Sequence, residues 1–265
     1  MNDYHWVGSQ ESFVDTLSIL KQEKIIIGRF GGNFSAGQTK NEDGCLVWHN
    51  QKEDWEFVIL LDAHHTTESA ELILQEFTKR KGSIKSLLSR SLNETFRRIE
   101  ETILQIFQTP EFLDSCKKVK GSTSCLIVLR KGKYIWWFSV GDCIFYLFHP
   151  ELANLGQYQV NQRHFFEWIG QVNTFELPVP CYSTGRKELR KGMNHIFLTT
   201  DGLIECPGLP YDHPEKIQNE FLHNSNDRAL ESLLRKIQSL NVRDSTTIIS
   251  WYVNSNLDAS LPCNQ

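Results

Sequence analysis

The sequence predicts an α+β fold in which two stacked, mainly antiparallel β-sheets are flanked by helices, giving four layers in the order α-β-β-α. Short apolar segments rich in Ile, Val, Phe and Trp recur along the 265 residues, as is typical of strands. Many of them lack strict apolar–polar alternation, which indicates that both faces of each sheet are covered. An antiparallel sheet buried on both faces needs a second sheet on one side and helices on the other.

The predicted strands follow one another along the chain. They span residues 57–61, 125–129, 134–140, 144–148, 196–198 and 247–253. Only residues 130–133 separate the second strand from the third, and Gly141 and Asp142 lead almost directly into the fourth. A parallel crossover needs a dozen or more residues, so the strands of each pair are expected to be antiparallel neighbours.

Helices are predicted where apolar residues recur every three or four positions. One long amphipathic helix is expected over residues 84–107, and another over 68–80. A third follows the apolar residues from Leu230 to Leu240, with Asn226 or Asp227 as its N-cap. These apolar stripes are interpreted as the faces that pack on the core.

Size and composition fit one domain over residues 1–265, with the motifs described below at 31–253 and a flexible polar tail at 254–265. The net charge of −4 argues against a general nucleic-acid-binding protein, which usually carries a basic surplus. No apolar run approaches the roughly 20 residues of a membrane span, and residues 1–8 lack signal-peptide features. We therefore expect neither nucleic acid nor membrane as a partner. The oligomeric state cannot be read from the sequence.

The seven cysteines are scattered and never form a Cys-x-x-Cys pair, which argues against a zinc site and a disulfide framework. Several lie within predicted strands, so we interpret them as buried free thiols. Free thiols indicate a reducing environment, and a cytoplasmic location is expected.

Acidic residues stand at the boundaries of the predicted strands. Each one alone is explained as a turn former, because Asp side chains bond to nearby backbone. Together, carboxylates held near one edge of a core would repel strongly unless cations neutralised them. Hard oxygen ligands favour Mg²⁺ or Mn²⁺. The residues concerned are Glu42, Asp43, Asp62, Asp142, Asp201 and Asp244.

Five segments, in this order, resemble motifs of the metal-dependent (PPM-type, or protein phosphatase 2C-like) protein serine/threonine phosphatases. They are 40–44 (Lys-Asn-Glu-Asp-Gly), 61–64 (Leu-Asp-Ala-His), 121–123 (Gly-Ser-Thr), 140–142 (Val-Gly-Asp) and 199–202 (Thr-Thr-Asp-Gly). Residues 244–247 (Asp-Ser-Thr-Thr) resemble the closing motif of the family. The ordered set spans residues 31–253 and is more specific than any single motif. The fold of that family is the same four-layer sandwich.

The resemblance implies a centre of two Mn²⁺ or Mg²⁺ ions, with a third, weaker site in many members. Asp62 would bridge two ions, the backbone carbonyl of Ala63 would bind one of them, and Asp142 would serve the third site. Asp43 would anchor metal-bound water or bind a metal itself. The other ligands, direct or through water, would be Glu42, Asp201 and Asp244.

The implied activity is removal of phosphate from phosphoserine and phosphothreonine of proteins, by direct attack of a metal-bridging hydroxide. A phosphorylated protein is the implied partner, and His64 would protonate the leaving alcohol. The family commonly places a phosphate-binding arginine where this chain has Gln38. Arg29 or Lys40 would substitute for it in binding substrate.

Two other functions stay open. One is a catalytically silent relative that binds a phosphoprotein or a regulatory partner, supported by Gln38 and by Ala63, where the family has glycine. The other is a metal phosphoesterase that acts on small molecules. The retained acidic set favours activity, since a pure scaffold has no need of clustered like charges. Residues 28–32 lack the Walker lysine and are interpreted as a turn, and 155–192 as a flap or an ordinary surface connection.

Overall fold

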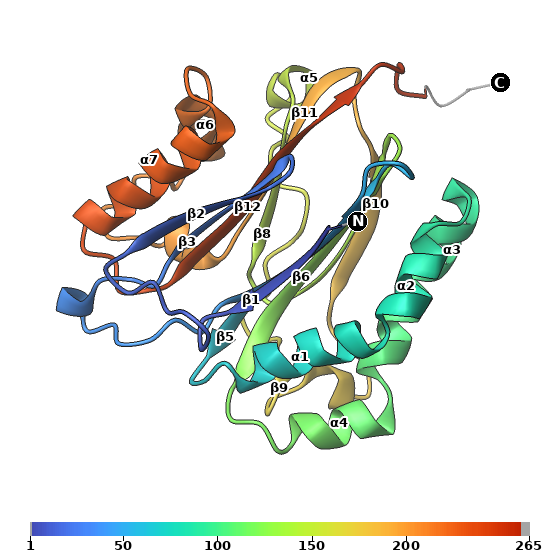
Figure 1. The fold of residues 1–265 in the computed structure, drawn as a ribbon, viewed down its shortest axis with the longest axis horizontal. Helices are drawn as coiled ribbons and strands as arrows, with labels where there is room; N and C mark the ends of the chain where they lie inside the picture. Colours follow the sequence, from blue (N-terminus) through green and yellow to red (C-terminus); the bar gives the residue numbers. More distant parts are fainter. Residues whose placement is uncertain (1, 261–265) are drawn as a thin grey trace.

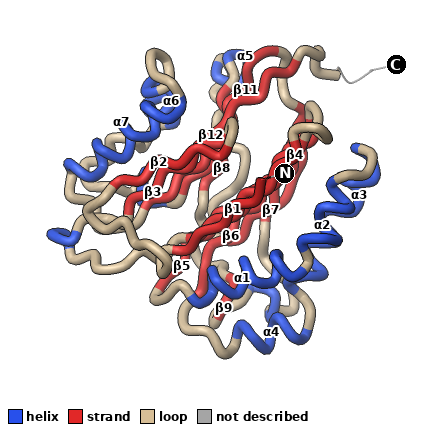
Figure 2. Tube along the Cα trace, viewed as in Figure 1, coloured by secondary structure: helices blue, strands red, loops and turns tan. Residues whose placement is uncertain are grey.

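The computed structural model describes residues 2–260, and its strands form two stacked sheets with helices on both outer faces (Figures 1 and 2). The first sheet is seven-stranded with the order β1-β4-β5-β6-β7-β10, and the short β9 pairs with β6. The second is five-stranded with the order β2-β3-β12-β11-β8. The pairings within both sheets are antiparallel, which confirms the predicted α-β-β-α sandwich.

The chain passes several times from one sheet to the other. The first sheet contains β1 (Asn2–Val7), β4 (Gly44–Asn50), β5 (Trp55–His64), β6 (Ser122–Lys131), β7 (Tyr134–Val140), β9 (Ile169–Gly170) and β10 (Ser183–Glu188). The second contains β2 (Leu17–Gln22), β3 (Ile25–Phe30), β8 (Ile144–Phe148), β11 (Gly192–Thr199) and β12 (Thr246–Ser255). Each predicted strand lies within one of these elements.

The helices divide between the two outer faces (Figure 1). The first sheet is covered by α1 (Glu68–Lys79), α2 (Lys81–Leu88), α3 (Leu92–Phe107) and α4 (Pro110–Cys116). The second is covered by α6 (Pro214–Glu220) and α7 (Asn226–Ser239), and the short α5 (Pro150–Ala153) follows β8. Single 3₁₀ turns occur at Phe34–Ala36, Thr174–Glu176 and Asp201–Leu203.

Strand β5 shows why apolar–polar alternation is missing from the sequence. Phe57 and Ile59 belong to the core that packs under α1–α4, while Val58 and Leu60 belong to the core between the two sheets. All four are fully buried. A strand with an apolar layer on each side must be apolar at every position, as the sequence pattern predicted.

The long helix expected over residues 84–107 is wrong in one respect, because it is two helices. The break lies between α2 and α3, where Ser91 caps the second helix. The Ser91 hydroxyl accepts a hydrogen bond from the Glu94 amide and donates one to the Glu94 carboxylate at 2.8 Å. The spacing Ser-x-x-Glu is that of a capping box, and the Ser91 side chain caps a new helix within an apolar pattern that stays helical on both sides.

The expected pairing of strands 134–140 and 144–148 is also wrong. β7 pairs with β6 and β10, whereas β8 pairs with β11 in the other sheet. The chain passes between sheets at Gly141, whose φ of +86° is rarely open to other residues. A Cβ at Gly141 would lie 2.2 Å from the Ser124 hydroxyl. This crossing places Asp142 between the ends of the two sheets.

Several elements carried too weak a signal for prediction. They include the strands β1, β2, β3, β4, β9 and β10, and residues 28–30 belong to β3 instead of the expected turn. The N-cap position of α7 is Ser225, just before the expected Asn226 or Asp227. Of the polar tail, residues 254–255 belong to β12 and the Ser260 amide donates to Glu188, while 261–265 lie outside the described residues.

The cysteines and the helices agree with two further expectations from the sequence, as far as the described residues show. The six cysteines among them are free thiols, and five of these are buried, while Cys263 lies outside. None of the described helices has the length and apolar character needed to cross a bilayer.

Candidate metal centre

The acidic residues singled out in the sequence meet at one end of the sandwich. Asp62 lies near the end of β5, and Asp43 directly precedes β4, which pairs with β5 in the first sheet. Asp201 follows β11 and Asp244 precedes β12 in the second sheet. Asp142 lies on the crossing between the sheets. In an antiparallel sheet the end of one strand lies beside the start of its neighbour, so these residues lie at the same end of each sheet. Stacking of the two sheets brings these two ends together.

Three of these carboxylates form the centre of the cluster. Asp62, Asp142 and Asp201 each offer an oxygen, and these oxygens lie within 4.8 Å of one another. Ser124 on β6 donates a 2.6 Å hydrogen bond to Asp142 and fixes its position. The arrangement brings together side chains that lie up to 139 positions apart (201 − 62) in the chain.

Asp43 is fully buried and joins the two sheets. Its Oδ2 accepts a 2.6 Å hydrogen bond from the Thr247 hydroxyl on β12 and a longer one of 3.4 Å from Thr200. Its backbone N–H donates to the Asn41 side chain at 2.9 Å. The second sheet therefore holds one oxygen of a carboxylate that belongs to the first sheet.

Burial and mutual repulsion act on the pKa values of the cluster. Burial raises the pKa of Asp62 well above its usual value, and the charges of Asp201, Asp43, Asp244 and Asp142 raise it further. Burial also raises the pKa of Asp201 to about 8 and that of Asp43 to about 7, in both cases with help from Asp244. The protein alone thus leaves these carboxylates without adequate positive charge.

The residues fit a bound cation. One oxygen each of Asp43, Asp62 and Asp201 is buried and has no hydrogen-bond partner. A buried carboxylate oxygen without a donor is costly, and divalent cations that prefer oxygen ligands would satisfy such atoms. The cluster could therefore hold Mg²⁺ or Mn²⁺.

A solvent-accessible hollow of about 390 Å³ opens beside the cluster. It contains two of the predicted ligands and both charge signs: its lining residues are Gln38, Lys40, Glu42, His65, Arg243 and Asp244. Lys40 forms a 2.6 Å ion pair with Glu42 and donates to the His65 carbonyl. Partial burial raises the pKa of Asp244, and the neighbouring His64 opposes this effect.

Two predicted residues lie at the end of β5. His64 is the last residue of the strand and is near Asp244. Ala63 pairs with Thr123 in ordinary strand geometry and its side chain belongs to the core under the helices. Because Ala63 needs no positive φ here, its Cβ does not strain the backbone at this position.

Arg29 is not among the residues that line the hollow, so its predicted contact with substrate gains no support from this structure. Its guanidinium is buried, donates to Ser18 at 2.8 Å and to the Tyr4 hydroxyl, and lies 4.4 Å from the Phe13 ring centroid. It lies 5.0 Å from the Trp6 ring centroid. The Arg29 guanidinium is therefore engaged by groups inside the protein. Of the predicted substrate contacts, Lys40 and Gln38 are the ones that line the hollow.

Sequence reasoning missed two arginines. Arg243 lines the hollow and directly precedes the predicted ligand Asp244, so its position next to that motif was a usable signal. Arg163 lies 4.0 Å from both Asp142 and Asp201. It belongs to no recognised motif, and only the folded chain brings it to the cluster.

The fold is that of the serine/threonine phosphatases. A bacterial serine phosphatase superposes with a TM-score of 0.64 at 14% identity, covering 88% of this chain and 99% of its own. Stp1 from Staphylococcus aureus gives 0.61 at 13% identity, covering 91% and 94%. RsbX, solved in complex with magnesium, gives 0.55 at 14% identity, covering 90% and 100%. No family model and no curated protein matches the sequence. The expected resemblance to these phosphatases is confirmed in fold, with a strongly diverged sequence.

Proposed function

We propose that this chain is a metal-dependent protein phosphatase that hydrolyses phosphoserine and phosphothreonine. The observation that carries the proposal is a buried cluster of carboxylates, built from both sheets, that lacks enough positive charge to balance it. Three of its carboxylate oxygens have no hydrogen-bond partner. Clustered carboxylates are unfavourable in a purely structural role, since each raises the cost of ionising the others. The shared fold with serine/threonine phosphatases supports the same activity.

The metal ligands are proposed from the residues that surround the cluster. Bound divalent cations would neutralise substrate phosphate and supply a water of lowered pKa for direct attack on phosphorus. The proposed ligands are Glu42, Asp43, Asp62, Asp142, Asp201 and Asp244 and the carbonyl of Ala63. Thr247 and Thr200 hold one Asp43 oxygen and leave the other free for a cation or its water.

The hollow beside the cluster is the proposed phosphate entrance. Arg243 is the residue that we assign to phosphate binding, because an arginine can donate two parallel hydrogen bonds to a phosphate. It would do so in place of the arginine that is absent at Gln38. Lys40 supplies a second positive charge, already oriented by Glu42. His64, beside Asp244, would donate a proton to the leaving alcohol.

The alternatives are less well supported. A silent binding protein would gain nothing from three partnerless buried oxygens, and the backbone at Ala63 does not require the glycine of the family. Activity restricted to small phosphate esters is an outcome of the experiment below. A single domain over residues 1–265 and a cytoplasmic location remain predictions.

The experiment measures hydrolysis of p-nitrophenyl phosphate and of a phosphothreonine peptide with Mn²⁺ and then with excess chelator. We expect turnover that requires the metal and falls at least about 10³-fold in Asp62→Asn and in Asp201→Asn. Asp114→Asn, an exposed aspartate on α4, is the matched control and should retain full activity. Circular dichroism confirms that each variant is folded.

Three results would contradict the proposal. They are turnover that survives the chelator, Asn variants as active as the parent, and binding of the phosphopeptide without turnover at any metal concentration. Turnover of p-nitrophenyl phosphate without turnover of any phosphoserine or phosphothreonine peptide would instead assign the chain to small-molecule phosphoesterases.

A further inference from the structure

Arg163 places a positive charge next to two aspartates of the acidic cluster. Its Nη2 lies 4.0 Å from Asp142 Oδ2, 4.0 Å from Asp201 Oδ2 and 2.5 Å from Glu205 Oε1. Among the described residues, it is the only cation paired with either of these two cluster aspartates. It reaches them from the connection between α5 and β9, outside every strand that supplies a cluster residue.

The position of Arg163 is built into the fold. Its Nε donates a 3.2 Å hydrogen bond to the backbone carbonyl of Asp142, and its guanidinium lies 4.7 Å from the Phe165 ring centroid. The next residue, His164, donates its N–H to the Gly141 carbonyl at 2.9 Å. Two consecutive residues are thus docked on the turn that carries Asp142, and the Arg163 side chain is only 17% exposed.

The distances leave the cluster oxygens available to another cation. At 4.0 Å the guanidinium attracts Asp142 and Asp201 through charge but forms no hydrogen bond with their carboxylates. Its close partner is Glu205, which is half exposed and lies outside the cluster. A cation bound between Asp142 and Asp201 would therefore lie near a positive charge that Glu205 holds in place.

We propose that Arg163 is a resident cation that competes with a metal ion for the Asp142 side of the cluster. The proposal rests on the proposed function only in that the cluster binds divalent metal. Two like charges a few ångströms apart in a partly buried site repel strongly. Arg163 therefore weakens binding at this position, while an ion held by Asp43, which forms no ion pair with the guanidinium, is affected less.

The test is a Mn²⁺ titration of the full chain, followed by the electron paramagnetic resonance signal of free Mn²⁺. Arg163→Gln removes the charge and should bind its weakest ion about tenfold more tightly than the parent. Arg163→Lys keeps the charge and should stay near the parent. Adding Asp142→Asn to Arg163→Gln should abolish the gain, since the competing ion loses its ligand.

The matched control is Arg190→Gln. Arg190 forms the same kind of arginine–glutamate pair, with Nη2 2.6 Å from Glu151 Oε2, but no cluster aspartate is paired with it. Its substitution should leave Mn²⁺ binding unchanged. Any gain in Arg163→Gln that Arg190→Gln also shows would be a non-specific charge effect and would overturn the proposal.

Two further outcomes would overturn it, and they are distinguishable. Unchanged or weaker binding in Arg163→Gln, with the parent binding Mn²⁺ better than Asp62→Asn does, would refute the competition alone. Equal and negligible binding in the parent and in Asp62→Asn would refute the metal centre, and with it both the competition and the proposed function.

Discussion

Strand β5 carries a buried acid at each end, and the two ends are balanced in opposite ways. Glu56 and Asp62 are an even number of residues apart, so both side chains face the second sheet, with Val58 and Leu60 between them. Glu56 is 1% exposed and Asp62 is 3% exposed. The same strand therefore holds two carboxylates that are almost equally buried but differ in the charges and hydrogen-bond donors around them.

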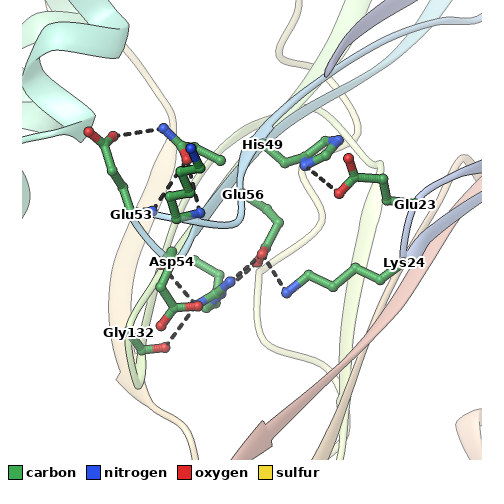
Figure 3. A network of polar contacts seen from close by, with 10 residues as sticks. Glu23, Lys24, His49, Glu53, Asp54, Glu56 and Gly132 are labelled. Carbon is green, nitrogen blue, oxygen red and sulfur yellow. Dashed lines mark hydrogen bonds and ion pairs between the residues drawn. The ribbon is translucent and has the colours of Figure 1, made fainter. Parts of the chain in front are cut away.

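At the Glu56 end the protein supplies its own counter-charge. Arg130 on the neighbouring β6 donates to both Glu56 oxygens, one of them at 2.5 Å, and also to the Asp54 carbonyl at 2.9 Å. Lys24 forms a second ion pair with Glu56 at 2.6 Å from the other sheet (Figure 3). The nearby His49 and Glu23 extend this polar network.

At the Asp62 end the neighbours are four more carboxylates. A buried ion without its partner costs several kcal/mol, so evolution normally removes it or neutralises it. The contrast teaches that charge balance, and not burial, distinguishes the end of the sandwich that carries the candidate metal centre from the opposite end. A cation bound from solution would supply at Asp62 the positive charge that Arg130 supplies at Glu56.

The largest expected effect is at the balanced end. Glu56→Gln leaves Arg130 buried without its carboxylate and should lower the free energy of unfolding by about 3 kcal/mol or more. Urea denaturation measures this. Replacing both residues, as Glu56→Gln with Arg130→Met, should recover part of the loss. A Glu56→Gln protein as stable as the parent would show that the two ends are not different after all.

The same change at the other end should act in the opposite direction. Asp62→Asn removes one of several repelling charges, so in excess chelator at pH 8 it should raise the free energy of unfolding by roughly 1 kcal/mol. Addition of Mn²⁺ should reverse the order, because only the parent gains full stabilisation from the metal. A variant less stable than the parent in chelator would contradict this account of the cluster.

The pH dependence of the metal-free protein sharpens the contrast. The pKa values of Asp43 and Asp201 are raised to about 7 and about 8, above the value near 4 expected in the unfolded chain. Between these limits the native state binds more protons than the unfolded state, so stability should fall as pH rises from about 4 to 8. Thermal unfolding in chelator measures the fall, and saturating Mn²⁺ should reduce it. A flat profile in chelator would count against buried, unbalanced carboxylates.

The smallest effect is expected for Lys24→Met. Lys24 is 43% exposed, and Arg130 remains to balance Glu56, so the loss should be about 0.5 kcal/mol. Equilibrium unfolding in urea at low and high salt checks both the size and the screening. A loss as large as that of Glu56→Gln would mean that Lys24, and not Arg130, is the main counter-charge.

The sequence alone predicted the architecture and the acidic set. Strands such as β5 and β7 are apolar at most positions, and this pattern indicates that both faces of the sheet are covered. The acidic residues could be selected because each stands next to such a strand or within a short motif. These signals lie within a few consecutive residues, so no knowledge of distant contacts is needed to read them.

Tertiary structure decided how the charges are balanced. Only the folded chain shows that β7 and β8 lie in different sheets, that Arg29 is used inside the protein, and that Arg163 lies beside Asp142. Glu56 and Arg130, 74 positions apart, are likewise brought together only by the pairing of β5 with β6. The counter-charge of a side chain can come from a residue far away in the chain. The number of residues between the two does not tell how close they lie in the folded protein.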